Sequence, residues 1–275
     1  MTTAKVEKKE FGYHPSDFEA VRVRLKRLTG INLADSKDSM VYSRLSRRIR
    51  ALKFTNFEQY LSYLDKTQSE HEEFVNALTT NLTSFFREMH HFETLKQHIQ
   101  ANRRPMKIWC AASSTGEEPY SIAMTVVEAF NRFDAPVEII ASDIDSNVLS
   151  KAGRGVYPLK ELDGLPISQK KQFFHKGKGA NQGFARVVPE LRKLITFKRI
   201  NLMDDKYDVP SDFDIVFCRN VMIYFDKQTQ LQILGKILQH MKPNGLYFAG
   251  HSENFSHVSA LLKPMGKTVY SPRVQ

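Results

Sequence analysis

The sequence predicts an α/β protein, with an all-α N-terminal domain followed by a doubly wound, Rossmann-like parallel sheet that contains a small inserted antiparallel β-subdomain. Three observations predict this fold. The first 85 residues show only helical periodicity, and from residue 106 onward short apolar strands alternate with helices. Residues 155–193 interrupt that alternation with a glycine-rich hairpin pattern. We therefore expect a helical domain over residues 1–85 and a second domain over residues 86–275, with 155–193 as the insertion.

The composition is that of a globular protein, with 41% hydrophobic and 25% charged residues. No apolar run approaches the roughly 20 residues of a membrane span. The N-terminus lacks the apolar core of a signal peptide, so we expect a cytoplasmic protein. Cys110 and Cys218 each end an apolar run and are interpreted as buried hydrophobic residues. The nine histidines show no ligand spacing, and no metal site is predicted.

The net charge of +10 is unevenly distributed along the chain. Residues 21–53 contain ten basic and two acidic side chains. A basic field of this kind attracts an acidic partner, such as nucleic acid, an anionic membrane or an acidic protein surface. A solvated helix face is the alternative interpretation.

Four helices are predicted in the N-terminal domain. The first opens with a capping box of Ser16 and Glu19 and ends at Gly30. The second is amphipathic, because apolar side chains recur at helical spacing on one face and arginines occupy the other faces. The four helices cover residues 16–30, 40–54, 55–66 and 71–86, and the last should loosen near residues 79–81.

Strands and helices alternate in the second domain. The predicted helices cover residues 117–130, 146–152 and 227–242. The predicted strands cover residues 106–112, 136–145, 194–202, 213–218 and 246–251. Because the alternation indicates a parallel sheet, ligands should bind at the carboxyl ends of the strands.

The inserted segment has the chemistry of a hairpin, with Gly177, Gly179 and Gly183 beside the alternating residues 184–187. Its exposed edge could accept a peptide as an added strand. A surface hairpin that binds nothing is the alternative.

The loop after the first strand suits a ligand without phosphate. Residues 111–116 carry small side chains but include only Gly116, where a dinucleotide-binding loop has several glycines. Glu117 and Glu118 begin the next helix and would repel a phosphate at its N-terminus. A cationic or zwitterionic nucleoside fits this loop, and S-adenosylmethionine is such a molecule.

Polar side chains also end the other predicted strands. Asp143 is placed to accept hydrogen bonds from ribose hydroxyls, whereas Asp145 is interpreted as the cap of the next helix. Asn201 and Asn220 end two further strands, where their amides could read an adenine edge. An ordinary turn is the alternative for each asparagine.

Five stretches of the sequence carry a family resemblance: ALTTNLTSFFRE, ASSTGEEPYSIA, ASDID, FCRNVMIYFD and LYFAGHSENF. Together and in this order they closely resemble the chemotaxis-receptor glutamate O-methyltransferases, the CheR family. The resemblance runs over nearly the whole chain. It implies a class I methyltransferase domain that transfers methyl from S-adenosylmethionine to glutamates on the cytoplasmic helices of chemoreceptors. We expect a monomer that does not insert into the membrane.

The resemblance also implies roles for individual residues. In some family members the β-subdomain binds a short receptor tail as an added strand. Near the transferred methyl the resemblance implies Arg87, Arg219 and Tyr224. Residues that would meet the receptor helices are Arg44, Arg47, Arg48 and Arg50. Residues that would line the cofactor pocket are Gly116 of the first loop, Asn81, Thr83, Arg87, Glu118 or its neighbour Glu117, Asp143, Asn201, Leu202, Asn220 and Val221.

The implied reaction needs no general base, because a glutamate carboxylate with a pKa of about 4.3 is already ionised in the cytoplasm. Methyl transfer from a sulfonium is an in-line displacement, so the protein must align the reacting atoms. We expect Arg219, Arg87 and the Tyr224 hydroxyl to orient the carboxylate.

Two rival functions are considered. A nucleic-acid-binding protein or nucleic-acid methyltransferase would use the basic segment, but RNVMIY lacks an Asn-Pro-Pro-aromatic pattern and no aromatics interleave with the basic run. A non-catalytic scaffold would keep the cofactor pocket as a sensor.

Overall fold

The computed structural model describes residues 10–253, 255 and 260–273, so Asn254 of the last motif lies outside the described residues. The chain divides into two compact units, Met1–Thr80 and Asn81–Gln275. The boundary predicted after residue 85 falls in the irregular segment that opens the second unit. Among the described residues, no helix is both long enough and apolar enough to cross a membrane.

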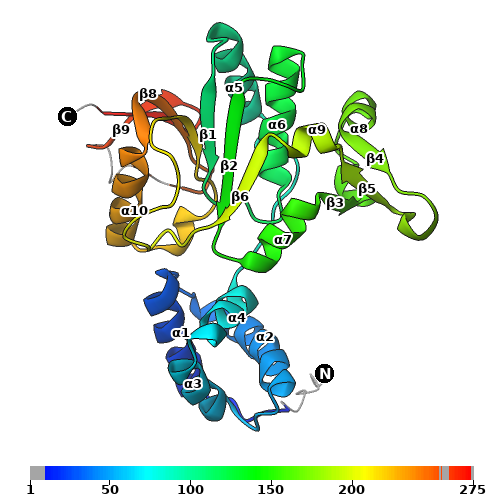
Figure 1. Ribbon diagram of the computed structural model, residues 1–275. Coiled ribbons are helices and arrows are strands. Elements are labelled where there is room, and N and C mark those ends of the chain that lie inside the picture. The colour runs from blue at the N-terminus through cyan, green and yellow to red at the C-terminus, as the bar shows by residue number, and fades with distance from the viewer. Residues whose placement is uncertain (1–9, 254, 256–259, 274–275) are drawn as a thin grey trace, which may run out of the picture. The chain divides into compact units, whose positions relative to one another are not determined.

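The first unit consists of helices joined by short turns (Figure 1). The predicted apolar face of the second helix is buried, since Val41, Leu45 and Ile49 have no exposed surface. The elements are α1 (Pro15–Thr29), η1 (Asp35–Lys37), α2 (Asp38–Ala51), α3 (Phe57–Lys66) and α4 (Gln68–Leu78).

Two details of these helices differ from the prediction. Helix α1 begins at Pro15, because proline has a φ suited to a first helical turn and lacks the amide hydrogen that would go unpaired there. Its N-terminal contact is made by Asp17, which accepts the backbone N–H of His14 at 2.8 Å, and not by Ser16 with Glu19. Helix α4 ends at Leu78, and residues 79–89 form no helix.

The second unit contains a mostly parallel sheet of seven strands in the order β6-β2-β1-β7-β8-β10-β9. Strands β6, β2, β1, β7 and β8 are parallel, as predicted, and β10 and β9 add an antiparallel edge. The strand order reverses between β1 and β7. The strands are β1 (Met106–Cys110), β2 (Val137–Asp143), β6 (Ile195–Arg199), β7 (Phe213–Phe217), β8 (Met241–Phe248), β9 (Leu262–Gly266) and β10 (Val269–Pro272).

Successive residues of the central strands are buried on opposite faces of the sheet. On one face Ile108, Ile139 and Ile215 join a core with α5 (His90–Ala101) and α6 (Glu117–Phe130). On the other face Trp109 packs against Phe213 with ring centroids 5.6 Å apart. The remaining helices are α7 (Ser146–Arg154) and α10 (Lys227–Gln239), with the short η4 (Met222–Tyr224) after β7.

The predicted insertion is a separate three-stranded antiparallel sheet in the order β3-β5-β4. Its buried face includes Tyr157 and Phe174, and both rings make edge contacts with Phe85, at centroid distances of 5.0 and 5.6 Å. The opposite face is solvent-exposed at Phe184 and Arg186. The elements are β3 (Val156–Pro158), η2 (Leu159–Leu162), α8 (Ile167–Phe173), β4 (Phe174–Lys176), η3 (Gly179–Asn181), β5 (Phe184–Val187) and α9 (Pro189–Arg192).

Candidate functional site

The candidate site lies at the carboxyl ends of β1, β2 and β7, where the strand order reverses. Loops that leave neighbouring parallel strands in opposite directions at such a point open a crevice, which is where ligands of these sheets bind. The loops after these three strands and the irregular segment 81–89 supply most of the side chains, and Glu253 after β8 adds another.

The loop after β1 requires a glycine at its end. Gly116 has a φ of 102°, and a Cβ atom there would lie only 2.6 Å from the Tyr157 hydroxyl. The backbone N–H of Ser114 donates to the Asp143 carboxylate at 2.8 Å, which joins this loop to the end of β2. The buried Ser113 hydroxyl has no hydrogen-bond partner among the described residues, so the loop holds a polar atom that a ligand could satisfy.

Asp143 ends β2 and accepts a second backbone hydrogen bond, from Asp145 at 3.0 Å. Burial raises the pKa of Asp143 to about 6, against the opposing effect of these hydrogen bonds. Asp145 caps α7 as predicted, accepting from the backbone N–H groups of Asn147 and Val148. Its second oxygen accepts the side-chain amide of Asn81 at 2.9 Å, so Asn81 is anchored beside Asp143.

The loop after β7 begins with a buried arginine. The Arg219 side chain has no exposed surface, and its Nη1 lies 2.6 Å from Glu118 Oε2. Its Nη2 lies 3.1 Å from Glu88 Oε2 and donates to the backbone carbonyl of Arg87 at 2.5 Å. One guanidinium therefore holds together the start of α6, the 81–89 segment and the end of β7.

The pKa values of the two carboxylates around Arg219 are shifted in opposite directions. Burial raises the pKa of Glu118, although Arg219 opposes this. Burial acts in the same sense on Glu88, but the charge of Arg219 and hydrogen bonds from His251 and Asn220 outweigh it and lower the pKa of Glu88. Glu88 is therefore the more firmly ionised partner.

Arg87 lies between two residues with unusual backbone conformations. Phe86 has a φ of 52° and Glu88 a φ of 60°, in the left-handed region that side chains with a Cβ disfavour. The Arg87 side chain is half-buried, and its Nη1 donates to the carbonyl of Leu82 at 3.2 Å. Such strained residues persist only where the surrounding structure determines them, and they gather at functional sites.

The buried carboxylate of Glu253 shapes the loop after Arg219. Glu253 Oε1 accepts from the backbone N–H groups of Val221 and Met222, at 2.9 and 2.8 Å. Its Oε2 accepts from Gly250 at 2.5 Å. Asn220 takes a φ of 58° in this loop, and a Cβ on Gly250 would lie 2.3 Å from the Asn220 amide nitrogen. Burial raises the pKa of Glu253 to about 7.

The structure does not bring all predicted site residues into mutual contact. The Glu117 carboxylate accepts from the Thr115 hydroxyl at 2.6 Å and does not contact Arg219. Asn201 and Leu202 follow β6, the outer strand beside β2. Thr83 is half-buried in the 81–89 segment, and Tyr224 is half-buried in η4.

Sequence reasoning missed Glu88 and Glu253. Each lies within a motif already quoted, FFRE and HSEN, but no spacing relates them to Arg219 or Val221. Their partners lie on other loops, so only the fold reveals the contacts.

The four arginines predicted to meet a receptor are not equivalent. Arg44 donates to the carbonyls of Ala77 and Thr79, at 3.2 and 2.5 Å. Arg48 pairs at 2.5 Å with Glu70, whose side chain is 2% exposed. Arg50 pairs with Glu10, whereas Arg47 is exposed and forms no ion pair with a described residue.

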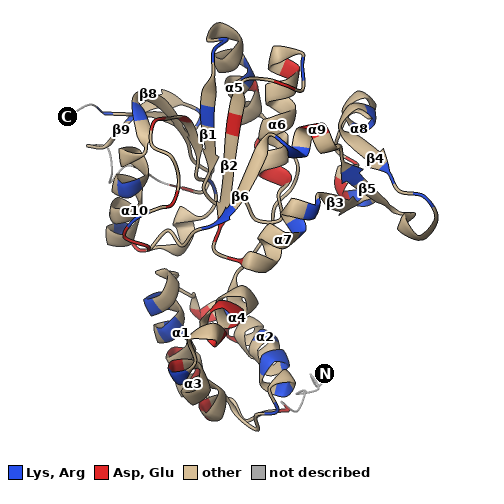
Figure 2. Ribbon diagram, in the orientation of Figure 1, with Lys and Arg blue, Asp and Glu red and all other residues tan. Residues whose placement is uncertain are grey.

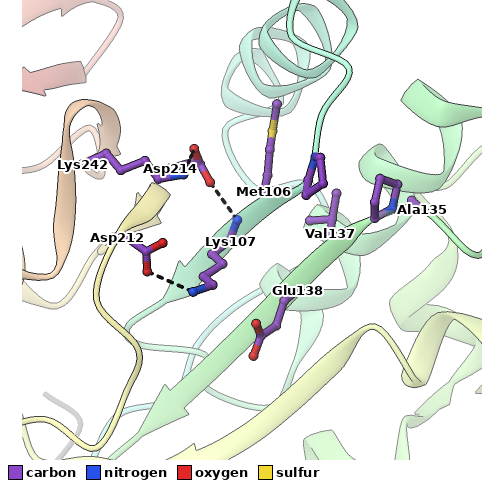
Figure 3. A pocket seen from close by; sticks show the side chains of 10 residues that line it. Met106, Lys107, Ala135, Val137, Glu138, Asp212, Asp214 and Lys242 are labelled. Carbon is purple, nitrogen blue, oxygen red and sulfur yellow. Dashed lines mark hydrogen bonds and ion pairs between the residues drawn. The ribbon is translucent and has the colours of Figure 1, made fainter.

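The opposite edge of the sheet also has a hollow, of about 570 Å³, at the amino ends of β1, β2, β7 and β8 (Figure 3). Four of its charged side chains form ion pairs: Lys107 contacts Asp212 at 2.9 Å, and Asp214 contacts Lys242 at 2.8 Å. Glu138 also lines the hollow, and no residue of the candidate site does.

The candidate site suits a phosphate-free, positively charged nucleoside. Its charged side chains include the carboxylates of Asp143, Glu118 and Glu88 and the guanidinium groups of Arg219 and Arg87, and Arg219 is already paired. No group of three or more potential metal ligands occurs in the described part of the chain. S-adenosylmethionine, as predicted, fits this donor set.

The family described as "CheR methyltransferase, SAM binding domain" matches residues 81–271, and "CheR methyltransferase, all-alpha domain" matches residues 16–79. Chemotaxis protein methyltransferase 2 of Pseudomonas aeruginosa is 55% identical over 96% of this chain and 95% of that protein. The chemotaxis protein methyltransferase of Salmonella typhimurium is 49% identical over 88% of this chain and 85% of that protein. The corresponding Escherichia coli protein is 46% identical, with 92% and 90% covered.

Proposed function

Because this chain belongs to the CheR family of S-adenosylmethionine-dependent methyltransferases, we propose that it methylates glutamate side chains of membrane-bound chemoreceptors. The observation that supports this best concerns the half-buried Arg87 at the carboxyl edge of the sheet. Its backbone carbonyl accepts a hydrogen bond from the fully buried Arg219. A partly accessible cation on a fixed backbone suits an anionic substrate group. The product would be a glutamate methyl ester.

The cofactor would lie along the loops after β1 and β2. Asp143 is placed to accept the ribose hydroxyls, and Gly116 allows the backbone to approach the ligand. Glu118, rather than Glu117, would face the positively charged end of the cofactor, because it lies beside Arg219 in the crevice. Asn201, Leu202, Asn220 and Val221 would contact the adenosine, and Asn81 and Thr83 would close the pocket.

The bound cofactor supplies an electrophilic methyl group on a sulfonium. The substrate carboxylate is ionised and needs no base, so the protein's task is alignment of the reacting atoms. Arg87 and the Tyr224 hydroxyl would bind one carboxylate oxygen and leave the other free to approach the methyl. Arg219 was expected to contact the carboxylate as well. Its side chain has no exposed surface, so we assign it the task of fixing Arg87.

The receptor's acidic methylation helices would meet the basic face of α2 (Figure 2). The first unit contains fourteen basic and eleven acidic residues among residues 1–80, so its net charge is modest. Arg47 offers an unpaired charge, whereas Arg44, Arg48 and Arg50 already have partners in the unit. Arg47 would therefore carry most of the electrostatic attraction.

The inserted sheet would bind a receptor tail as an added strand. Its middle strand is β5, so β4 is an edge strand that can pair with an extended peptide. Basic positions occur on this hairpin (Figure 2). Lys176, Lys178 and Arg186 are exposed and form no ion pair with a described carboxylate. Phe184 is 45% exposed beside them. An acidic tail with an aromatic side chain suits this surface.

The test is transfer of radiolabelled methyl from S-adenosylmethionine to receptor-containing membranes. The expected label is on the receptor and is released by mild base, because a carboxyl methyl ester hydrolyses under those conditions. Label in nucleic acid, base-stable label or no label would contradict the proposal. A soluble peptide copy of the tail should slow transfer to tailed receptors and leave transfer to truncated receptors unchanged.

A further inference from the structure

Glu88 links three segments that are far apart in the sequence. Its Oε2 lies 3.1 Å from Arg219 Nη2, at the end of β7. Its Oε1 accepts from the Asn220 side-chain amide at 3.4 Å and from the backbone N–H of His251, after β8, at 3.2 Å. Its side chain is only 10% exposed. A carboxylate this enclosed, with contacts to three segments, fixes their positions relative to one another.

Glu88 and its neighbour Arg87 contact the same nitrogen, Nη2 of Arg219. Arg219 Nη2 contacts the Glu88 carboxylate and also donates to the backbone carbonyl of Arg87, the preceding residue. Arg219 Nη1 is held by Glu118, so the guanidinium is clamped between two carboxylates. Without Glu88, Glu118 would be the only carboxylate paired with the guanidinium, so the donor to the Arg87 carbonyl would be fixed less firmly.

The backbone of this segment needs such a restraint. The left-handed conformations of Phe86 and Glu88 cost about 1–3 kcal/mol each. The backbone N–H of Phe86 is fixed by the Ser121 hydroxyl at 2.9 Å. On the other side of Arg87, the Glu88 carbonyl accepts from the His91 N–H at 3.0 Å, and the Glu88 side chain adds the contacts to Arg219 and His251.

His91 does not replace Glu88 as a partner of the arginine. Its Nδ1 lies 3.5 Å from Glu88 Oε2. Burial and the charge of Arg219 lower the pKa of His91 to about 3, so the imidazole is neutral at physiological pH. The charge that balances Arg219 on this side is therefore the Glu88 carboxylate.

We propose that Glu88 is a positioning residue for methyl transfer: through Arg219 it fixes the backbone of Arg87 so that the Arg87 guanidinium meets the substrate carboxylate. The inference rests on the proposed function and adds to it a residue outside the predicted site. Glu88 itself does not touch the substrate.

Glu88→Gln removes the negative charge of this side chain with little change in its shape. The amide oxygen of the glutamine can still accept from His251 and Asn220. A misplacement of about 1 Å can cost roughly a hundredfold in rate, so we expect kcat to fall about 10- to 100-fold. Affinity for S-adenosylhomocysteine and the receptor KM should stay close to wild type. Glu128→Gln is the matched control, because Glu128 pairs with Lys96 at 3.1 Å on α5 and α6 and has no contact with Arg219.

A double-mutant cycle shows whether Glu88 acts through Arg219. In an Arg219→Lys background, Glu88→Gln should lower kcat much less than in the wild type, because the shared contact is already weakened. Full additivity, or a wild-type kcat in the single variant, would overturn the proposal.

Amide hydrogen exchange separates this inference from the proposed function. Exchange in residues 86–89 should be faster in Glu88→Gln than in wild type and unchanged in Glu128→Gln. Unchanged exchange in Glu88→Gln overturns the positioning role even if the wild-type enzyme methylates no receptor. If the wild-type enzyme methylates no receptor but exchange is faster in Glu88→Gln, only the proposed function is contradicted.

Discussion

Arg219 and Glu118 form a buried ion pair, with 2.6 Å between Nη1 and Oε2, that joins the loop after β7 to the first turn of α6. The strands that precede these two residues, β7 and β1, are neighbours at the point where the strand order of the sheet reverses. The pair thus joins two of the loops between which the cofactor would bind.

Removing the arginine should destabilise the fold more than removing the glutamate. Arg219→Ala leaves Glu88 and Glu118 as unpaired buried carboxylates, whereas Glu118→Ala leaves Arg219 paired with Glu88. Breaking a buried pair costs about 3–5 kcal/mol, and we expect Arg219→Ala to reach this range. Urea denaturation of both variants measures the difference. An equal or reversed order would mean that Glu88 does not balance the arginine.

Cofactor affinity should decrease as pH falls through about 6, the pKa to which burial raises Asp143. Above that pH the carboxylate is ionised and can accept ribose hydroxyls, and below it the proton occupies an acceptor site. Binding should therefore weaken by at most about tenfold for each pH unit below the pKa. Calorimetric titration with S-adenosylhomocysteine at several pH values measures this. Asp143→Asn should bind weakly at every pH, and a pH dependence that persists in this variant would assign the titration to another group.

Tyr224→Phe and Arg87→Ala should lower kcat more than they weaken cofactor binding. Both side chains are half-buried, and both would contact the substrate carboxylate. Loss of one such contact costs about 10²–10³ in kcat in comparable oxyanion sites, and loss of the neutral tyrosine hydroxyl should cost less than loss of the arginine. Single-turnover rates with saturating receptor measure the effect. Wild-type rates in both variants would remove these two residues from the site.

Charge reversal at Arg47 and at Arg48 should have different consequences. Arg47→Glu should raise the apparent KM for the receptor and flatten its salt dependence, with little change in Tm, because Arg47 has no internal ion pair with a described residue. Arg48→Glu should lower Tm, since it places a second carboxylate beside the buried Glu70. Methylation rates at several salt concentrations and thermal melts distinguish the two. A normal salt response in Arg47→Glu would move the docking surface elsewhere.

Local patterns were sufficient for most of the fold. Apolar runs of strand length located the five parallel strands, and Asp145 was recognised as a cap from its position alone. Strands β9 and β10 were missed, because most side chains of β9 are exposed and show no alternation of apolar and polar residues. The capping box of α1 was predicted two residues too late, at Ser16 and Glu19, because the helix begins at Pro15 with His14 as its N-cap.

The candidate site was predicted in its residue types but not in its contacts. Hydrophobic periodicity is local, so it was enough to show that Asp143, Arg219 and Asn220 end strands and that a parallel sheet brings these strand ends to one edge. The burial of Arg219 between Glu118 and Glu88, and the hold of Glu253 on the loop after it, appear only in the folded chain. These contacts join loops that leave different strands. Their geometry depends on strand order and loop conformation, which a linear pattern does not contain.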